Sequence, residues 1–285
     1  MARENFVTTT IKEFAPDFPR DSNGWVVFGR DVELRRSLFP QEAFLHPAKA
    51  NLYMIQEMAR YLTEEGQSVI DPFAGTGSQL ISLLDNRKVV LIELEPYFLD
   101  IINQTVAAWR EKGLVNQTVL VYEGDCRQVL PKIQFLVDAA IFSPPYSTTM
   151  ASTGIRETDA DTESGTGRYK TQEYSRSSLN LSNLNPFLYS QHMDLVMKRL
   201  YSRITPGGKI CIISKDRIEG PKRVLLSETA ILRAHRNGFK LVKWLKHSPP
   251  STIAKASARI ALEKYGKVVQ VVLDEDLLIF TKPEL

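Results

Sequence analysis

Residues 68–77 read SVIDPFAGTG, and this stretch decides the fold. The apolar run 68–70 has the composition of a short buried strand, and Asp71 follows at its carboxyl end. Gly75 and Gly77 then form a turn in which the backbone can approach a ligand, because glycine has no Cβ. A helical pattern comes next. The segment therefore predicts a strand, a glycine turn and a helix, which is the setting of a nucleotide-like cofactor pocket.

The same alternation of strand and helix continues along the chain. Strand-like apolar runs occur at 68–70, 88–92, 118–122, 138–142 and 209–214. Helical patterns occur at 78–84, 97–112, 186–204 and 225–237. Near-continuous apolar strands separated by helices predict a parallel sheet that is covered on both faces. The last two runs, 239–245 and 277–280, have no helix packed tightly between them, so they predict an antiparallel hairpin at one edge of the sheet.

The composition limits the class of protein. Hydrophobic residues make up 43% and charged residues 24% of 285 residues, which is ordinary for a soluble globular protein. No apolar stretch approaches the roughly 20 residues that cross a bilayer, and the polar N-terminus carries no secretion signal, so we expect a cytoplasmic protein and no membrane partner. Cys126 and Cys211 provide neither a disulfide framework nor metal-ligand spacing, and no metal is expected. The net charge of +3 permits a nucleic-acid partner without demanding one.

Two segments stand outside the sheet pattern. Residues 1–45 are mixed in composition, and we interpret them as an N-terminal extension of a domain that covers 46–285. Residues 147–185 form a polar insertion rich in Ser, Thr, Asn and Asp. A loop of this length within a compact domain is usually either functional or disordered.

Acidic residues follow the next two predicted strands. Glu93 lies 18 residues after Gly75, where a carboxylate can accept hydrogen bonds from both hydroxyls of a ribose, and Glu95 is a rival for this role. Asp125 follows the third strand and could accept a hydrogen bond from the amine of an adenine ring, or could simply cap a turn. The turn 71–77 lacks the Gly-Lys-Ser/Thr ending of a phosphate-binding loop. The pattern thus favours an adenosine cofactor.

The fourth strand leads into the sequence Ser143-Pro144-Pro145-Tyr146. Two consecutive prolines fix φ and remove two N–H donors, so carbonyl oxygens can face the site without competing local donors. The Ser143 hydroxyl and the Pro144 carbonyl could hold both hydrogens of an amino group and free its lone pair to attack a methyl sulfonium. Tyr146 offers a flat face on which a base could stack. A plain Pro-Pro turn after a strand is the alternative.

In order and content these pieces resemble the DNA amino-methyltransferases, which use S-adenosylmethionine to methylate exocyclic nitrogens. The matching positions are 71–77, Glu93, Asp125 and 143–146, and FLHPAK at 44–49 is similar to the family's N-terminal cofactor motif. The resemblance implies an α/β fold of the Rossmann-like class I methyltransferase type. That fold has a seven-stranded, mostly parallel sheet with one antiparallel edge strand and helices on both faces.

The resemblance also implies roles for single residues. The cofactor would contact His46, Pro47, Lys49, Asp71, Phe73, Gly75, Gly77, Glu93, Asp125 and Cys126. The target amine and base would be held by Ser143, Pro144, Pro145 and Tyr146. Within the first set, Glu93 would hold the ribose, whereas Asp125 and the backbone of Cys126 would meet the adenine. The residues before them in the chain would surround the methionine part.

A serine at position 143 is typical of cytosine N4 methylation in this family, whereas aspartate or asparagine there more often accompanies adenine N6 methylation. The resemblance implies a site-specific DNA (cytosine-N4) methyltransferase, acting on double-stranded DNA whose target base is flipped out of the helix. It would serve a restriction-modification system with a cognate endonuclease, or act alone. No part of the sequence is an obvious recognition domain of 80 or more residues, roughly the size of a small domain. A DNA-contacting loop at 147–185 or a homodimer partner could supply recognition.

Three alternatives stay open. An adenine-N6 DNA methyltransferase and an RNA amino-methyltransferase would use the same chemistry on another base or polymer. A catalytically silent binding subunit would keep the fold without the reaction. Methylation of DNA or RNA in the presence of S-adenosylmethionine discriminates the enzymes from the silent subunit.

Overall fold

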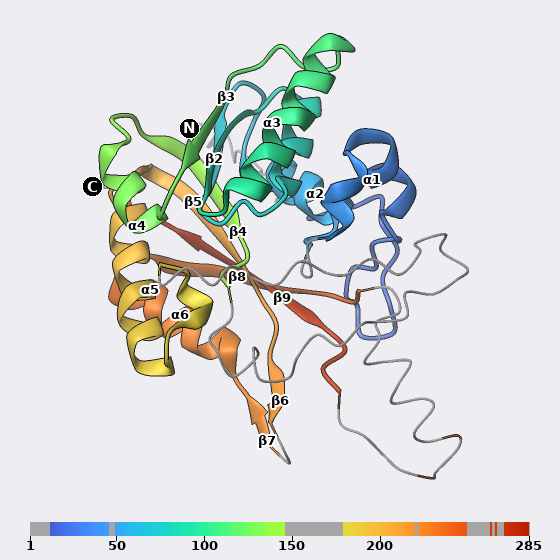
Figure 1. The fold of residues 1–285 in the computed structure, drawn as a ribbon. Helices are drawn as coiled ribbons and strands as arrows, with labels where there is room; N and C mark the ends of the chain where they lie inside the picture. The colour runs from blue at the N-terminus through green and yellow to red at the C-terminus, as the bar shows by residue number, and fades with distance from the viewer. Residues whose placement is uncertain are drawn as a thin grey trace, which may run out of the picture.

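The computed structural model describes residues 12–45, 49–145, 179–219, 222–249 and 271–284, together with positions 263 and 266. Its main sheet consists of β1 (Ser68–Asp71), β2 (Lys88–Glu93), β3 (Val119–Glu123), β4 (Val137–Phe142), β5 (Ile204–Ser214), β8 (Lys240–His247) and β9 (Glu275–Thr281). The seven strands lie in the order β3-β2-β1-β4-β5-β9-β8 (Figure 1). All neighbouring pairs are parallel except those of β9, which runs antiparallel to both β5 and β8. The Rossmann-like class I methyltransferase fold predicted from the sequence is confirmed.

Helices cover both faces of this sheet (Figure 1). The α-helices are α1 (Val32–Leu38), α2 (Leu52–Leu62), α3 (Pro96–Glu111), α4 (Cys126–Val129), α5 (Pro186–Tyr201) and α6 (Leu226–Arg236), and the 3-10 helix η2 spans Ser78–Asp85. Successive strand residues point to opposite faces, so Val69 packs in one apolar core with α2 and α3, and Ile70 in another with α5 and α6. Among the described residues, no helix combines the length and the apolar character that a membrane span needs.

Local sequence explains where the elements begin and end. The Asn51 side chain accepts hydrogen bonds from the N–H groups of Tyr53 and Met54, which caps α2. Asn185 caps α5 in the same way, and Pro186 occupies its first position. The helical pattern predicted at 78–84 is present as η2, a 3-10 helix rather than an α-helix.

Two details of the sheet differ from the expectation. The strand expected at 209–214 begins earlier, at Ile204, and runs through Pro206-Gly207-Gly208, residue types that are common in turns. The pairing of β4 with β5 shifts register between Val137 and Ala139, and a Cβ at Gly208 would lie 2.8 Å from the Asp138 carbonyl oxygen. Only glycine fits that close approach. A second sheet, the two-stranded ribbon β6 (Arg217–Glu219) and β7 (Lys222–Val224), was not expected.

The described part of the N-terminal segment packs onto the domain. Phe14 and Phe28 are buried in the same apolar core as α2 and α3. Val26 forms a bridge with His247 at the end of the edge strand β8, and the indole N–H of Trp109 in α3 donates to the Leu38 carbonyl oxygen at 2.5 Å. The segment therefore shares the core of the domain that follows it.

Arg35 of α1 is a buried junction between this segment and the domain. It is 1% exposed and pairs with Asp31 at 2.8 Å. Its guanidinium also donates to the Ala50 carbonyl oxygen at 2.7 Å and to the Ser78 hydroxyl at 3.2 Å. Asp31 in turn accepts from the N–H of Leu52 at 3.0 Å. One planar cation thus joins α1 to the starts of α2 and η2.

We expect Arg35→Leu to lower the free energy of unfolding by about 2–4 kcal/mol, because it leaves a half-buried carboxylate and two carbonyl or hydroxyl acceptors without the guanidinium. The matched control is Arg36→Leu on the same helix, where the arginine is exposed and pairs with exposed Glu33. That change should cost less than about 1 kcal/mol. Urea denaturation of both variants measures the difference. Equal losses of unfolding free energy would contradict the role of Arg35 as a buried junction.

Candidate active site

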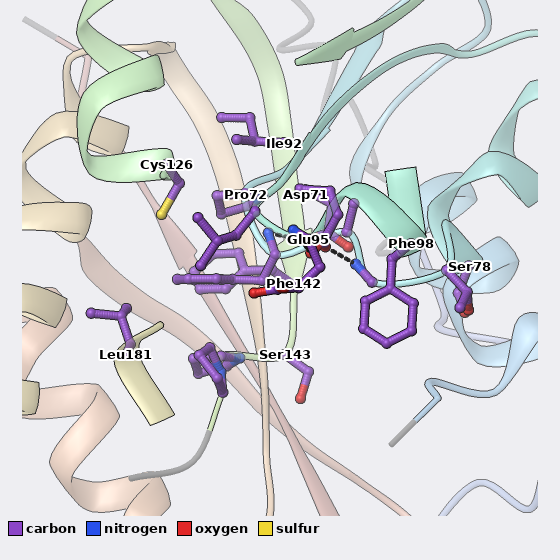
Figure 2. A pocket seen from close by; sticks show the side chains of 18 of the residues that line it. Asp71, Pro72, Ser78, Ile92, Glu95, Phe98, Cys126, Phe142, Ser143 and Leu181 are labelled. Atoms are coloured by element: carbon purple, nitrogen blue, oxygen red, sulfur yellow. Dashed lines mark hydrogen bonds between the residues drawn. The ribbon is translucent and has the colours of Figure 1, made fainter. Parts of the chain in front are cut away.

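A pocket opens at the carboxyl ends of β1, β2 and β4 (Figure 2). The strand order reverses between β1 and β4, because the chain moves outward to β2 from one and to β5 from the other. Ligands of open α/β sheets bind at such a reversal. The lining comes from the glycine turn, the end of β2, the start of α4, the end of β4 and the segment before α5: residues 71–76, 92–95, 124–126, 142–145 and 179–181.

The Glu93 carboxylate ties the glycine turn to the end of β2. One of its oxygens accepts the Gly75 N–H at 2.6 Å, and the other accepts the Glu95 N–H at 2.9 Å. Gly75 adopts φ 53°, a left-handed conformation that favours glycine. Each carboxylate oxygen has a second lone pair, so Glu93 can still accept from a ligand while the backbone fixes its orientation.

Burial changes the acidity of two carboxyl groups in this pocket. Burial, together with the nearby charge of Glu93, raises the pKa of Asp71 to about 7, although the Phe73 N–H donor favours the ionised form. Burial also raises the pKa of Glu93 to about 7, although the N–H groups of Glu95 and Gly75 favour its ionised form. Both groups are therefore poised to lose a proton near neutral pH when a cation or hydroxyl donor arrives.

Glu95 also reaches the pocket, as Figure 2 shows. Its Oε1 is buried and accepts no hydrogen bond from the described residues. A buried carboxylate oxygen without a donor is costly, so this atom is suited to a donor from a ligand. Glu93 and Glu95 are therefore both placed to accept hydrogen bonds from a ribose.

Asp125 is held by an arginine that the sequence pattern did not single out. Its carboxylate accepts the Arg127 N–H at 2.8 Å and pairs with the Arg127 guanidinium at 2.6 Å. Arg127 also donates to the Leu179 carbonyl oxygen at 2.7 Å, so it fixes the wall formed by 179–181. Neither Arg127 nor that wall was expected, because Leu179 lies 52 residues away in sequence.

Cys126 begins α4 beside this pair, and its thiol is buried in the pocket wall. Burial raises the pKa of the Cys126 thiol well above its ordinary value, with the Asp125 charge as a second cause. A thiol in that state is not a thiolate nucleophile. Its place agrees with a backbone contact rather than covalent chemistry.

The residues that follow β4 also line the pocket. Ser143 is exposed, and Pro144 and Pro145 are half-buried in the lining. Phe142, just before them, packs its ring 5.9 Å from that of Phe73 in the glycine turn. The structure therefore brings the predicted amine-binding residues to the same pocket as the predicted cofactor residues. Tyr146 lies outside the described residues.

The other predicted cofactor residues divide into three cases. Lys49 lines the pocket and donates to the Phe44 carbonyl oxygen at 2.9 Å; burial, and secondarily the Arg35 charge, lowers its pKa to about 8. His46 and Pro47 lie outside the described residues. Gly77 does not line the pocket: it has φ 82°, and a Cβ there would lie 3.0 Å from the Ile102 side chain of α3. Its smallness serves helix packing.

Residues 22–104 match the sequence model of a family described as DNA methylase. This part of the chain includes the glycine turn, Glu93 and Lys49. None of the curated proteins compared with the chain matches it significantly. The family match supports a methyltransferase that uses S-adenosylmethionine.

Several solved structures are similar to the chain at low identity. TrmN from Thermus thermophilus is 14% identical, with a TM-score of 0.47 over 85% of this chain, and the match spans about half (51%) of that protein. A methyltransferase from Pyrococcus furiosus is 13% identical, with a TM-score of 0.45 over 84% of this chain and 87% of its own. The N-methyltransferase NodS from Bradyrhizobium japonicum WM9, solved with S-adenosyl-L-homocysteine, is 11% identical, with a TM-score of 0.48 over 82% and 86%.

Proposed function

We propose that this protein transfers a methyl group from S-adenosylmethionine to the N4 amine of cytosine in double-stranded DNA. The observation that carries the proposal is the meeting of two sets of residues in one pocket. Glu93, Asp71 and Asp125 face it from the carboxyl ends of three strands, and Ser143 and Pro144 face it from a fourth. The first set suits an adenosine cofactor and the second suits an amino group.

The donor set of the pocket fits S-adenosylmethionine. The Glu93 carboxylate is oriented by two backbone N–H groups and keeps lone pairs for ribose hydroxyls. Asp71 offers a buried anion for an ammonium group, and Asp125 offers an acceptor for the adenine amine. Phe142, Ile92 and Leu181 provide apolar surface for the rings. The bound cofactor supplies an electrophilic methyl sulfonium.

The β4 end would hold the other reactant. The exposed Ser143 hydroxyl and the Pro144 carbonyl can accept the two hydrogens of an amino group, and this leaves its nitrogen lone pair directed at the methyl donor. A base inside a duplex cannot reach this pocket, so the target must be flipped out and stacked, with Tyr146 as the proposed stacking partner. Catalysis then consists mainly of positioning two reactants.

The match to the DNA methylase family supports DNA as the polymer, and Ser143 favours cytosine within that family. Methylation of adenine N6 or of RNA would use the same pocket and is distinguished by the product. A silent binding subunit is disfavoured by the buried carboxyls. Burial raises the pKa of both Asp71 and Glu93 to about 7, a cost that a fold without a ligand has no reason to keep.

Incubation with S-adenosylmethionine and either duplex DNA or total RNA, followed by digestion and mass spectrometry of nucleosides, tests the proposal. We expect N4-methylcytosine from DNA and no methylated nucleoside above background from RNA. N6-methyladenine would overturn the choice of base. Cofactor binding without transfer to either polymer would favour the silent subunit instead.

The ribose acceptor can be identified by comparing S-adenosylhomocysteine with its 2′-deoxy analogue in a calorimetric titration. In the unmodified protein, loss of the hydroxyl should weaken binding about tenfold to a hundredfold, as expected for a hydrogen bond to a charged group. Glu93→Gln should remove most of this difference, because it removes the charged acceptor. The matched variant Glu95→Gln should retain it, and the reverse pattern would assign the ribose to Glu95.

A further inference from the structure

The two-stranded ribbon β6–β7 lies beside the candidate active site and has no role in the cofactor pocket. Phe142 pairs with Ile212 across β4 and β5, so Ser143 leaves its strand level with Ile213, which itself lines the pocket. The ribbon begins at Arg217, four residues after Ile213. Figure 1 shows that it extends away from the main sheet and the helices. The ribbon therefore projects from the carboxyl ends of the strands, where the target base would enter.

The ribbon presents an exposed cation near its projecting end. Of the four cations in the ribbon and the turn before it, Lys215 and Arg223 pair with carboxylates at its base, Glu275 and Asp216. Asp216 is buried and is neutralised by Arg223 at 2.8 Å, so it presents no free negative charge to solvent. Lys222, in contrast, is exposed near the far end of the ribbon. An exposed cation on a projecting element suits a phosphate of a polyanion.

Ion pairs hold the base of the ribbon in place. Asp216 accepts the Ser227 N–H of α6 at 3.2 Å in addition to its pair with Arg223. Arg223 also approaches Asp274 at 3.9 Å, and Lys215 pairs with Glu275 of β9 at 3.5 Å. These contacts join the ribbon to α6 and to the start of β9. An element fixed in this way loses little conformational entropy when it binds a partner.

We propose that the β6–β7 ribbon binds duplex DNA by entering the groove next to the flipped target base. The major groove admits a two-stranded β-ribbon. Neighbouring strands lie about 4.8 Å apart, so the base of the ribbon is on the order of 10–15 Å from Ser143. That distance is well inside one helical turn of DNA, about 34 Å. The inference rests on the proposed function and names an element of the described residues that contacts the duplex.

The test compares Lys222→Gln with Lys88→Gln, measuring duplex affinity across a range of salt concentrations. Both lysines are exposed, but Lys88 begins β2 and so lies at the amino ends of the parallel strands, away from the pocket at their carboxyl ends. If Lys222 contacts one phosphate, its variant should bind about fivefold to tenfold more weakly near 0.1 M salt, and the slope of log K against log salt should fall by about 0.9. Lys88→Gln should match the unmodified protein, and both variants should keep its affinity for S-adenosylhomocysteine.

Cross-linking gives a readout that does not depend on a change in affinity. The chain has two cysteines, Cys126 and Cys211, and both are buried. Lys222→Cys therefore adds a surface thiol, which should form a disulfide with a duplex that carries a tethered thiol near the target cytosine. Lys88→Cys should not cross-link to the same duplex.

The possible outcomes separate the two proposals. If the unmodified protein binds duplex DNA but Lys222→Gln behaves like Lys88→Gln and no selective cross-link forms, the ribbon proposal fails and the proposed function stands. If the unmodified protein binds RNA alone, or no nucleic acid, both proposals fail. Selective cross-linking together with the reduced salt slope supports the ribbon.

Discussion

The pocket depends on the hydrogen bonds that the Glu93 carboxylate accepts from Gly75 and Glu95. They connect a turn after one strand to the end of the neighbouring strand and satisfy backbone N–H groups that the turn leaves without helix or sheet partners. Their cost is the burial of the carboxyl group, and burial raises the pKa of both Glu93 and the neighbouring Asp71 to about 7. The turn is thus held in shape by a group that a bound ligand can also use.

Two buried arginines extend this arrangement to the walls. Arg35 binds the Ala50 carbonyl and the Ser78 hydroxyl, both in residues that line the pocket, from a helix near the N-terminus. Arg127 binds Asp125 and the Leu179 carbonyl, which joins the adenine side of the proposed site to the segment before α5. A guanidinium suits both positions because its planar fork presents several donors in fixed directions. The pocket is therefore assembled from segments far apart in the chain.

The sequence predicts those features that local chemistry determines. Apolar strand runs, the glycine turn and the Pro-Pro exit from β4 all depend on adjacent residues, and apart from the earlier start of β5 their positions in the structure agree with the expectation. The contacts of Arg127 with Leu179 and of Arg35 with Ser78 depend on tertiary packing, and no local pattern indicates them. The β6–β7 ribbon has only three residues in each strand, too few for a recognisable alternation.

The most direct measurement of the central claim is calorimetric titration of S-adenosylhomocysteine in buffers of different ionisation enthalpy. The pKa of Asp71 and that of Glu93 are both raised to about 7, and ligand donors favour the ionised carboxylates. Binding near pH 6 should therefore release one to two protons, and affinity should rise up to about tenfold per pH unit for each group until about pH 7.5, below the lowered pKa of Lys49, about 8. Affinity independent of pH, with no proton released, would contradict the account.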